Sequence, residues 1–120
     1  MTSQRVLYVE DHPSLRAAVL MSLEAAGFGV LGAGDGLEGV DVARRERPDV
    51  ILMDLHLPRM SGWEALQALQ NDPDTSAIPV IAVTAGELDP VRARSAGFAD
   101  FIPKPFQASR LIGAIRTILD

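Results

Sequence analysis

Five short apolar segments, separated by longer amphipathic stretches, constrain most strongly how this 120-residue chain can fold. Val and Ile are frequent in them, as in strands that are buried on both faces of a parallel sheet. The pattern therefore predicts strands at residues 5–10, 29–33, 49–54, 79–84 and 100–104.

Helix signals fill the intervals between these strands. Apolar residues at helical spacing run from Leu15 to Ala26, and Gly27 follows them where a C-cap glycine is expected. Three further helices are predicted to begin after residues whose side chains can accept hydrogen bonds from free backbone N–H groups. These N-caps are Asp35, Ser61 (with Glu64 in a capping box) and Asp89. The apolar stripe of a fifth helix contains Leu111, Ala114, Ile115, Ile118 and Leu119.

Strands that alternate with helices predict an α/β fold, a mostly parallel sheet with helices on both faces. Right-handed crossovers leave few topologies, and five such units favour the flavodoxin-like strand order 2-1-3-4-5. No linker, repeat or low-complexity tract divides the chain, so we expect residues 1–120 to form a single domain.

Composition excludes several classes of function. A net charge of −5 argues against unspecific binding to nucleic acid. The absence of cysteine excludes disulfides and thiolate chemistry. No apolar run approaches the roughly 20 residues of a membrane span, and the first ten residues lack the apolar core of a signal peptide. We therefore expect a cytoplasmic protein that neither inserts into membranes nor binds nucleic acid directly.

Polar residues stand where the predicted strands end. Glu10 and Asp11 end the first strand, and Asp54 ends the third. With strand order 2-1-3-4-5, the first and third strands flank the point where ligands bind in open α/β sheets. Three carboxylates at this point repel one another unless a cation neutralises them. Oxygen ligands without His or Cys favour Mg²⁺.

Two further residues complete this edge of the predicted sheet. Thr84 ends the fourth strand and brings a hydroxyl, and Lys104 follows the fifth and brings an ammonium group. Taken singly, an Asp at a strand end is usually a helix cap, Thr a strand former and Lys a surface residue. Together they form a cradle for a phosphoryl group, with Asp54 as the nucleophile that becomes an aspartyl-phosphate.

Four segments resemble the receiver domain of two-component response regulators (CheY-like), and the resemblance covers essentially the whole chain. They are VLYVEDH with Glu10 and Asp11, VILMDLHLPRMSG with Asp54, PVIAVTA with Thr84, and AGFADFIPKPF with Phe101, Lys104 and Pro105. The departures are mild: Glu10 replaces an Asp of many members, and Phe101 stands where others have Tyr.

The resemblance implies a role for each matching position. Asp54 is the phosphoacceptor, and Mg²⁺ is held by Asp11, Asp54 and the backbone carbonyl of His56, with Glu10 commonly acting through water. The phosphoryl group is bound by Lys104, Thr84 and the backbone of Ala85. Thr84 and Phe101 are the switch residues, and the peptide bond between Lys104 and Pro105 is often cis.

The resemblance also implies partners. A histidine kinase or histidine phosphotransfer protein donates the phosphoryl group, and an unidentified effector responds to the surface of the fourth helix, fifth strand and fifth helix. Residues 90–97, "PVRARSAG", have few apolar side chains, so we expect them to shift on phosphorylation. A phosphorylation-dependent dimer remains open, and both a stand-alone regulator and a receiver excised from a larger protein fit the chain.

Three alternatives remain. One is a Mg²⁺-dependent phosphohydrolase that uses an aspartyl-phosphate on an external substrate, although such enzymes need a second acid where this chain has His56. Another is a degenerate receiver that serves only as a binding module. A dinucleotide-binding loop is suggested by GDGLEG at 34–39, but Asp35 and Glu38 bring negative charge there, which favours a turn and helix cap. We expect a signalling phosphoacceptor that promotes its own phosphorylation and dephosphorylation, not an enzyme.

Overall fold

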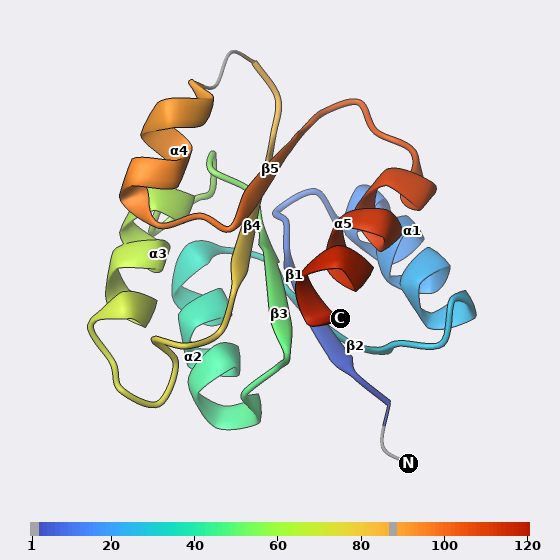
Figure 1. Cartoon of the computed structure of the whole chain (residues 1–120), viewed down its shortest axis with the longest axis horizontal. Helices are drawn as coiled ribbons and strands as arrows, with labels where there is room; N and C mark the ends of the chain where they lie inside the picture. Colours follow the sequence, from blue (N-terminus) through green and yellow to red (C-terminus); the bar gives the residue numbers. More distant parts are fainter. Residues whose placement is uncertain (1–2, 87–88) are drawn as a thin grey trace.

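Parallel strands form the centre of the computed structural model, which describes residues 3–86 and 89–120. Within these residues the strands are β1 (Arg5–Val9), β2 (Gly29–Ala33), β3 (Val50–Met53), β4 (Val80–Thr84) and β5 (Asp100–Pro103). All neighbours pair in parallel, in the order β2-β1-β3-β4-β5, and the twisted sheet crosses the middle of the molecule (Figure 1). The predicted α/β topology is therefore confirmed.

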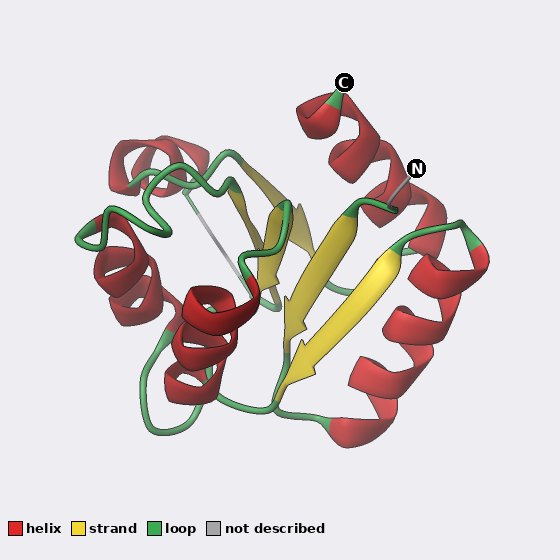
Figure 2. Ribbon diagram, turned by 90° about the horizontal axis from the view of Figure 1, so that it is seen from below, coloured by secondary structure: helices red, strands yellow, loops and turns green. Residues whose placement is uncertain are grey.

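Helices cover both faces of this sheet. They are α1 (Pro13–Ala25), α2 (Gly36–Glu46), α3 (Gly62–Gln70), α4 (Pro90–Ala96) and α5 (Ala108–Leu119). Helices α1 and α5 lie on one face, and α2, α3 and α4 lie on the other (Figure 2). Among the described residues, none of these helices is long and apolar enough to cross a membrane.

The sheet separates two apolar cores because successive side chains of a strand point to opposite faces. In β1, Val6 and Tyr8 belong to the core beneath α1 and α5, whereas Leu7 and Val9 belong to the core beneath α2, α3 and α4. The four residues of β3 are fully buried and divide in the same way. Burial on both faces explains why the strand segments are apolar without alternation.

The N-caps predicted from the sequence are all present. The side chains of Asp35, Ser61 and Asp89 each accept a backbone hydrogen bond in the first turn of α2, α3 and α4, and Ser61 forms the predicted capping box. Helix α1 begins after His12, a cap that the sequence analysis does not assign; its Nδ1 accepts from the N–H of Leu15 at 3.4 Å.

The strands β1, β3 and β5 end one residue earlier than predicted, and β3 and β4 begin one residue later. Glu10, Asp54 and Lys104 therefore follow the strands instead of ending them. Each still donates one backbone hydrogen bond to the neighbouring strand. These bonds join Glu10 to Ala33, Asp54 to Val9 and Lys104 to Thr84, with N···O distances of 3.0, 3.1 and 2.8 Å. The backbone beneath the three charged side chains is thus fixed by the sheet.

Candidate phosphoacceptor and metal site

Lys104 bridges two carboxylates at the carboxyl edge of the sheet. Its Nζ donates to Asp54 Oδ2 at 2.7 Å and also contacts Glu10 Oε1. The lysine side chain is 18% exposed, that of Asp54 6% and that of Glu10 1%. Charge-assisted hydrogen bonds with so little solvent are among the stronger ones in proteins, and breaking one side leaves a buried charge without a partner.

An acidic cluster forms around this bridge, as the strand order predicts. Carboxylate oxygens of Glu10, Asp11 and Asp54 all lie within 4.8 Å of one another. Asp11 is exposed while the other two are buried, so the cluster opens to solvent on one side. Oxygen donors at this spacing, without sulfur or nitrogen ligands, fit a hard ion that keeps some of its water, which is the chemistry of Mg²⁺.

Burial and neighbouring charge shape the ionisation of the bridge. Burial raises the pKa of Glu10 most strongly, and Asp54 raises it further. Lys104 lowers it, but the net effect is a raised pKa. Burial alone would lower the pKa of Lys104, but hydrogen bonds to Asp54 and Glu10 raise it overall. Because the folded protein holds the Glu10 proton more tightly than the unfolded chain, Glu10 makes the metal-free protein less stable as the pH rises from 4.5.

The loop that follows β3 holds Asp54 from the other side. The backbone N–H of His56 donates to Asp54 Oδ1 at 3.0 Å, while the His56 side chain is exposed. Gly62, the first residue of α3, donates its N–H to the carbonyl of Leu55 at 3.1 Å. A Cβ at Gly62 would overlap the Asp54 backbone oxygen and lie 2.7 Å from the Leu55 Cα. This close approach explains the glycine at that position.

Thr84 lies at the same edge of the sheet but does not join the acid–lysine network. Its side chain is buried, and its hydroxyl donates to the carbonyl oxygen of Ala85 at 3.2 Å. Ala85 is exposed beside Lys104. The structure therefore places both residues near the lysine without a hydrogen bond from Thr84 to any carboxylate of the described residues.

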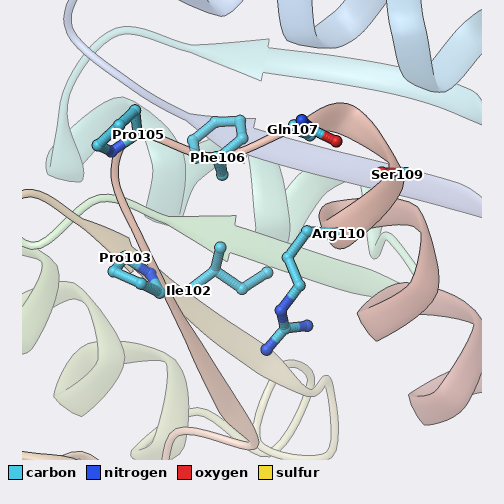
Figure 3. A pocket seen from close by; sticks show the side chains of 7 residues that line it. All are labelled: Ile102, Pro103, Pro105, Phe106, Gln107, Ser109 and Arg110. Atoms are coloured by element: carbon cyan, nitrogen blue, oxygen red, sulfur yellow. The ribbon is translucent and has the colours of Figure 1, made fainter.

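The segment that carries Lys104 has two further predicted features. Phe101 is half-buried and packs against the core beneath α2, α3 and α4. The peptide bond between Lys104 and Pro105 is cis. Next to this segment lies a pocket of about 430 Å³ between β5 and the start of α5, lined by the residues labelled in Figure 3. A second pocket, of about 340 Å³, opens onto Lys104 and is bordered by Leu15, Pro105 and Phe106.

The sequence motifs assign no role to two residues that the structure places near the site, Arg16 and Tyr8. Arg16 of α1 donates from Nη1 to the backbone carbonyl of Glu10 at 2.7 Å, which ties α1 to the end of β1. Tyr8 is fully buried two residues before Glu10. Strand alternation could have identified Tyr8, because it places residues two apart on one face; Arg16 required the tertiary structure.

The GDGLEG segment forms a turn and a helix start. Asp35 Oδ1 accepts from the N–H of Glu38 at 2.8 Å, and Glu38 Oε1 accepts from the N–H of Gly34 at 2.9 Å. The preceding strand, β2, is at the edge of the sheet, away from the crevice between β1 and β3. The two carboxylates already accept from backbone N–H groups of this turn, and their negative charge would repel a pyrophosphate, which opposes a dinucleotide site.

A parallel 2-1-3-4-5 sheet with acids after β1 and β3 and a lysine after β5 is the architecture of a phosphoacceptor module. The family model of the response regulator receiver domain matches residues 6–116, so the chain belongs to this family. Receiver domains of this family act in two-component signalling with histidine kinases and downstream effectors, and they bind Mg²⁺ at an acidic site.

Relatives of different length share this domain. The chain is 40% identical over 117 residues to the protein PilH of Pseudomonas aeruginosa, covering 96% of this chain and 97% of PilH. It is 35% identical over 117 residues to the DNA-binding dual master transcriptional regulator RpaA of Synechocystis, covering 96% of this chain but only 48% of RpaA.

A solved structure provides a metal-bound comparison. The receiver domain of the sensor histidine kinase PA1611 of Pseudomonas aeruginosa was crystallised with a magnesium ion coordinated in its active-site cleft. It superposes on this chain with a TM-score of 0.89 at 32% identity, covering 98% of both chains. The acidic cluster described above lies in a fold of the same kind.

Proposed function

We propose that residues 1–120 form one receiver domain in which Asp54 accepts a phosphoryl group from the phosphohistidine of a histidine kinase or phosphotransfer protein. The observation that carries this assignment is the Lys104 bridge: its Nζ lies 2.7 Å from Asp54 Oδ2 inside an acidic cluster suited to Mg²⁺. Among the three clustered acids, Asp54 is the one that hydrogen-bonds both this lysine and the backbone N–H of His56.

The transfer is a displacement at phosphorus. A carboxylate oxygen of Asp54 forms a bond to the phosphorus, the P–N bond to the donor histidine breaks, and the electron pair remains on the imidazole nitrogen. Glu10, Asp11, Asp54 and the carbonyl of His56 would hold Mg²⁺, which supplies positive charge for the phosphoryl oxygens. Lys104, Thr84 and the backbone N–H of Ala85 would bind the remaining oxygens.

Hydrolysis then returns Asp54 to the carboxylate, with water attacking phosphorus and the P–O bond to the aspartyl group breaking. Under this proposal the protein is a phosphoacceptor that assists its own modification and not an enzyme with an external substrate. Thr84 and Phe101 would carry the change to the face formed by α4, β5 and α5, where an effector or a second phosphorylated copy would bind. The pocket between β5 and α5 gives that face a concave surface (Figure 3).

The decisive experiment is labelling by a small phosphodonor. Wild-type protein incubated with radiolabelled acetyl phosphate and Mg²⁺ is expected to acquire an acid-labile label that hydroxylamine also removes, as is typical of an acyl phosphate. Asp54→Asn should abolish labelling, and chelation of Mg²⁺ should do the same. Asp35→Asn is the matched control, because Asn also caps a helix and Asp35 lies away from the cluster. Equal labelling of Asp54→Asn and wild type would refute Asp54 as the acceptor.

The same preparation tests the remaining alternatives. Steady release of phosphate from phosphate monoesters, with Asp54-dependent turnover, would favour the phosphohydrolase. Failure to bind Mg²⁺ in calorimetry, together with no labelling, would favour a binding module.

A further inference from the structure

The hydroxyl of Tyr8 is a buried donor that has no hydrogen-bond partner among the described residues. Tyr8 is the single tyrosine of the chain, and its side chain is fully buried in β1. Its oxygen makes no hydrogen bond to any atom of the described residues. Leaving a buried polar group unpaired is costly, whereas Phe would fill the same space without that cost. Packing alone therefore does not explain why this position carries Tyr and not Phe.

Its position suggests which group it serves. Tyr8 of β1 faces the core beneath α1 and α5. Glu10 directly follows β1 and continues its pairing through the hydrogen bond to Ala33, so strand alternation places its side chain on the same face. Gly32 and Leu52, its partners in β2 and β3, carry no polar side-chain atom. The carboxylate of Glu10, itself 1% exposed, is the acceptor on this side of β1.

Electrostatics keep the hydroxyl a donor. Burial raises the pKa of Tyr8 far above its usual range, and the charges of Glu10 and then Asp54 raise it further. The phenol therefore remains protonated throughout the physiological range and keeps an O–H that can donate.

The charge of Glu10 depends on the state of the site. In this structure Lys104 compensates both Glu10 and Asp54. Under the proposed function, on which this inference rests, Lys104 turns to the phosphoryl group on Asp54 and its contact with Glu10 weakens. Glu10 is too buried to replace that contact freely with bulk water.

We propose that Tyr8 is a positioning residue whose hydroxyl donates to the Glu10 carboxylate when Lys104 engages the phosphoryl group, and so holds Glu10 oriented toward the metal. In this structure Glu10 is close enough to raise the pKa of Tyr8 through its charge and a hydrogen-bonding contribution, but the hydroxyl forms no hydrogen bond of ordinary geometry with any described residue. Tyr8 touches neither the phosphoryl group nor the metal and acts through Glu10.

Tyr8→Phe separates this role from a structural one. Removing an unpaired hydroxyl should leave the unfolding midpoint of the metal-free protein unchanged or slightly higher. Labelling by acetyl phosphate at saturating Mg²⁺ should slow about tenfold, the effect of losing a hydrogen bond to a charged group. A parallel loss of stability and rate, or no change in rate, would overturn the proposal.

A double-mutant cycle tests the route through Glu10. In a Glu10→Asp background the side chain is one methylene shorter, so the carboxylate lies farther from the Tyr8 hydroxyl. Adding Tyr8→Phe there should change the labelling rate by less than about twofold. If the tenfold loss persists there, Tyr8 does not act through Glu10 and the proposal fails.

A third measurement requires no substitution at Tyr8. Since the chain has one tyrosine, ¹³C labelling of the ring gives a single Cζ resonance that responds to hydrogen bonding at the hydroxyl. Adding Mg²⁺ and beryllofluoride, a phosphoryl analogue, should shift this resonance, and Glu10→Asp should suppress the shift. If backbone resonances around Asp54 respond while Cζ does not, this inference fails and the proposed function stands. If neither responds and acetyl phosphate gives no label, the proposed function fails as well.

Discussion

The loops that follow β3 and β4 both reach the site, yet they are built in different ways. The loop after β3 is packed from two sides: a Cβ at Gly62 would overlap the Asp54 backbone oxygen, and one at Gly36 of α2 would overlap the carbonyl of Met60. After β4, Gly86 has a positive φ of 88°, and a Cβ added there would meet no described atom within 4 Å. Residues 87 and 88, which follow it, lie outside the described part of the chain.

Helices α3 and α4, which follow these two loops, also differ in how tightly they are packed. Helix α3 has a capping box and buries Gly62, Ala65, Leu66 and Leu69, whereas α4 buries only Ala93 among its described side chains. Val91 of α4 is 71% exposed. An element with few buried contacts opens at a lower free-energy cost. The comparison indicates that the β3 side fixes Asp54, while the β4 side has fewer buried contacts to hold it.

The largest effect is expected from Gly62→Ala. The added methyl meets backbone atoms that cannot yield, so the free energy of unfolding should fall by about 3 kcal/mol, and labelling of Asp54 should fall with it. Urea unfolding measures the first and acetyl phosphate labelling the second. Gly113→Ala in α5 is the control: with open space around it, it should stabilise by about 0.5–1 kcal/mol. Equal tolerance of the two substitutions would mean that the β3 loop is not tightly packed.

Of the two regions compared, binding of magnesium should locally protect the loop after β3 and not α4. At a concentration one hundred times its dissociation constant, Mg²⁺ should raise the free energy of unfolding by about 2.7 kcal/mol. Amide exchange should slow in residues 55–62 beyond the global effect, with no such local change in residues 90–96. Asp54→Asn, which removes one charge from the cluster, should reduce both responses. Local protection spread equally over the two segments would remove the distinction between them.

Gly86→Ala probes the open loop. Its positive φ is unfavourable for alanine, so we expect a loss of about 1 kcal/mol, much less than at Gly62. Labelling of Asp54 should stay within about twofold of wild type, because no described atom is displaced. A loss as large as that of Gly62→Ala would show that the β4 loop is as constrained as the β3 loop.

The smallest effect is expected at the contact between α4 and α3. The guanidinium of Arg92 lies 4.4 Å from the Trp63 ring centroid, and the ring also packs edge-on against Phe98 at 5.4 Å. Arg92→Ala should cost about 0.5 kcal/mol, shift the fluorescence of the single tryptophan and speed amide exchange in α4. Arg94→Ala on the same helix is the control. Unchanged exchange in α4 would show that this contact does not hold the helix.

Much of the fold could be predicted because its signals are local. Apolar runs and the N-caps Asp35, Ser61 and Asp89 depend on a few neighbouring residues, and all appear in the structure. Gly27 ends α1 as expected, one residue past the C-cap Ala26 and with a positive φ. The strand boundaries were less accurate, since hydropathy does not mark where the last ladder hydrogen bond falls. His12 was missed as a cap because histidine is an uncommon one.

The site was predictable in its members but not in its contacts. Parallel strands bring their carboxyl ends to one edge, so the order of the strands is enough to gather Glu10, Asp11 and Asp54. The strand order does not predict that Lys104 contacts both Glu10 and Asp54. Nor does it predict that the Thr84 hydroxyl donates to the carbonyl of Ala85. Those hydrogen bonds depend on small differences in the positions of side chains, which the order of the strands does not determine.

The sequence by itself determined the alternation of strands and helices, the caps, and the set of chemical groups at the strand ends, because each follows from local propensity and pattern. Only the tertiary structure decided which groups meet. Lys104 reaches Glu10 across 94 residues, and Arg92 reaches Trp63 between helices. The Tyr8 hydroxyl finds no partner within the described part of the chain. The physical reason is that burial and partner choice arise from packing elements far apart in the chain. Those same contacts, and not the motif alone, influence the ionisation of the site.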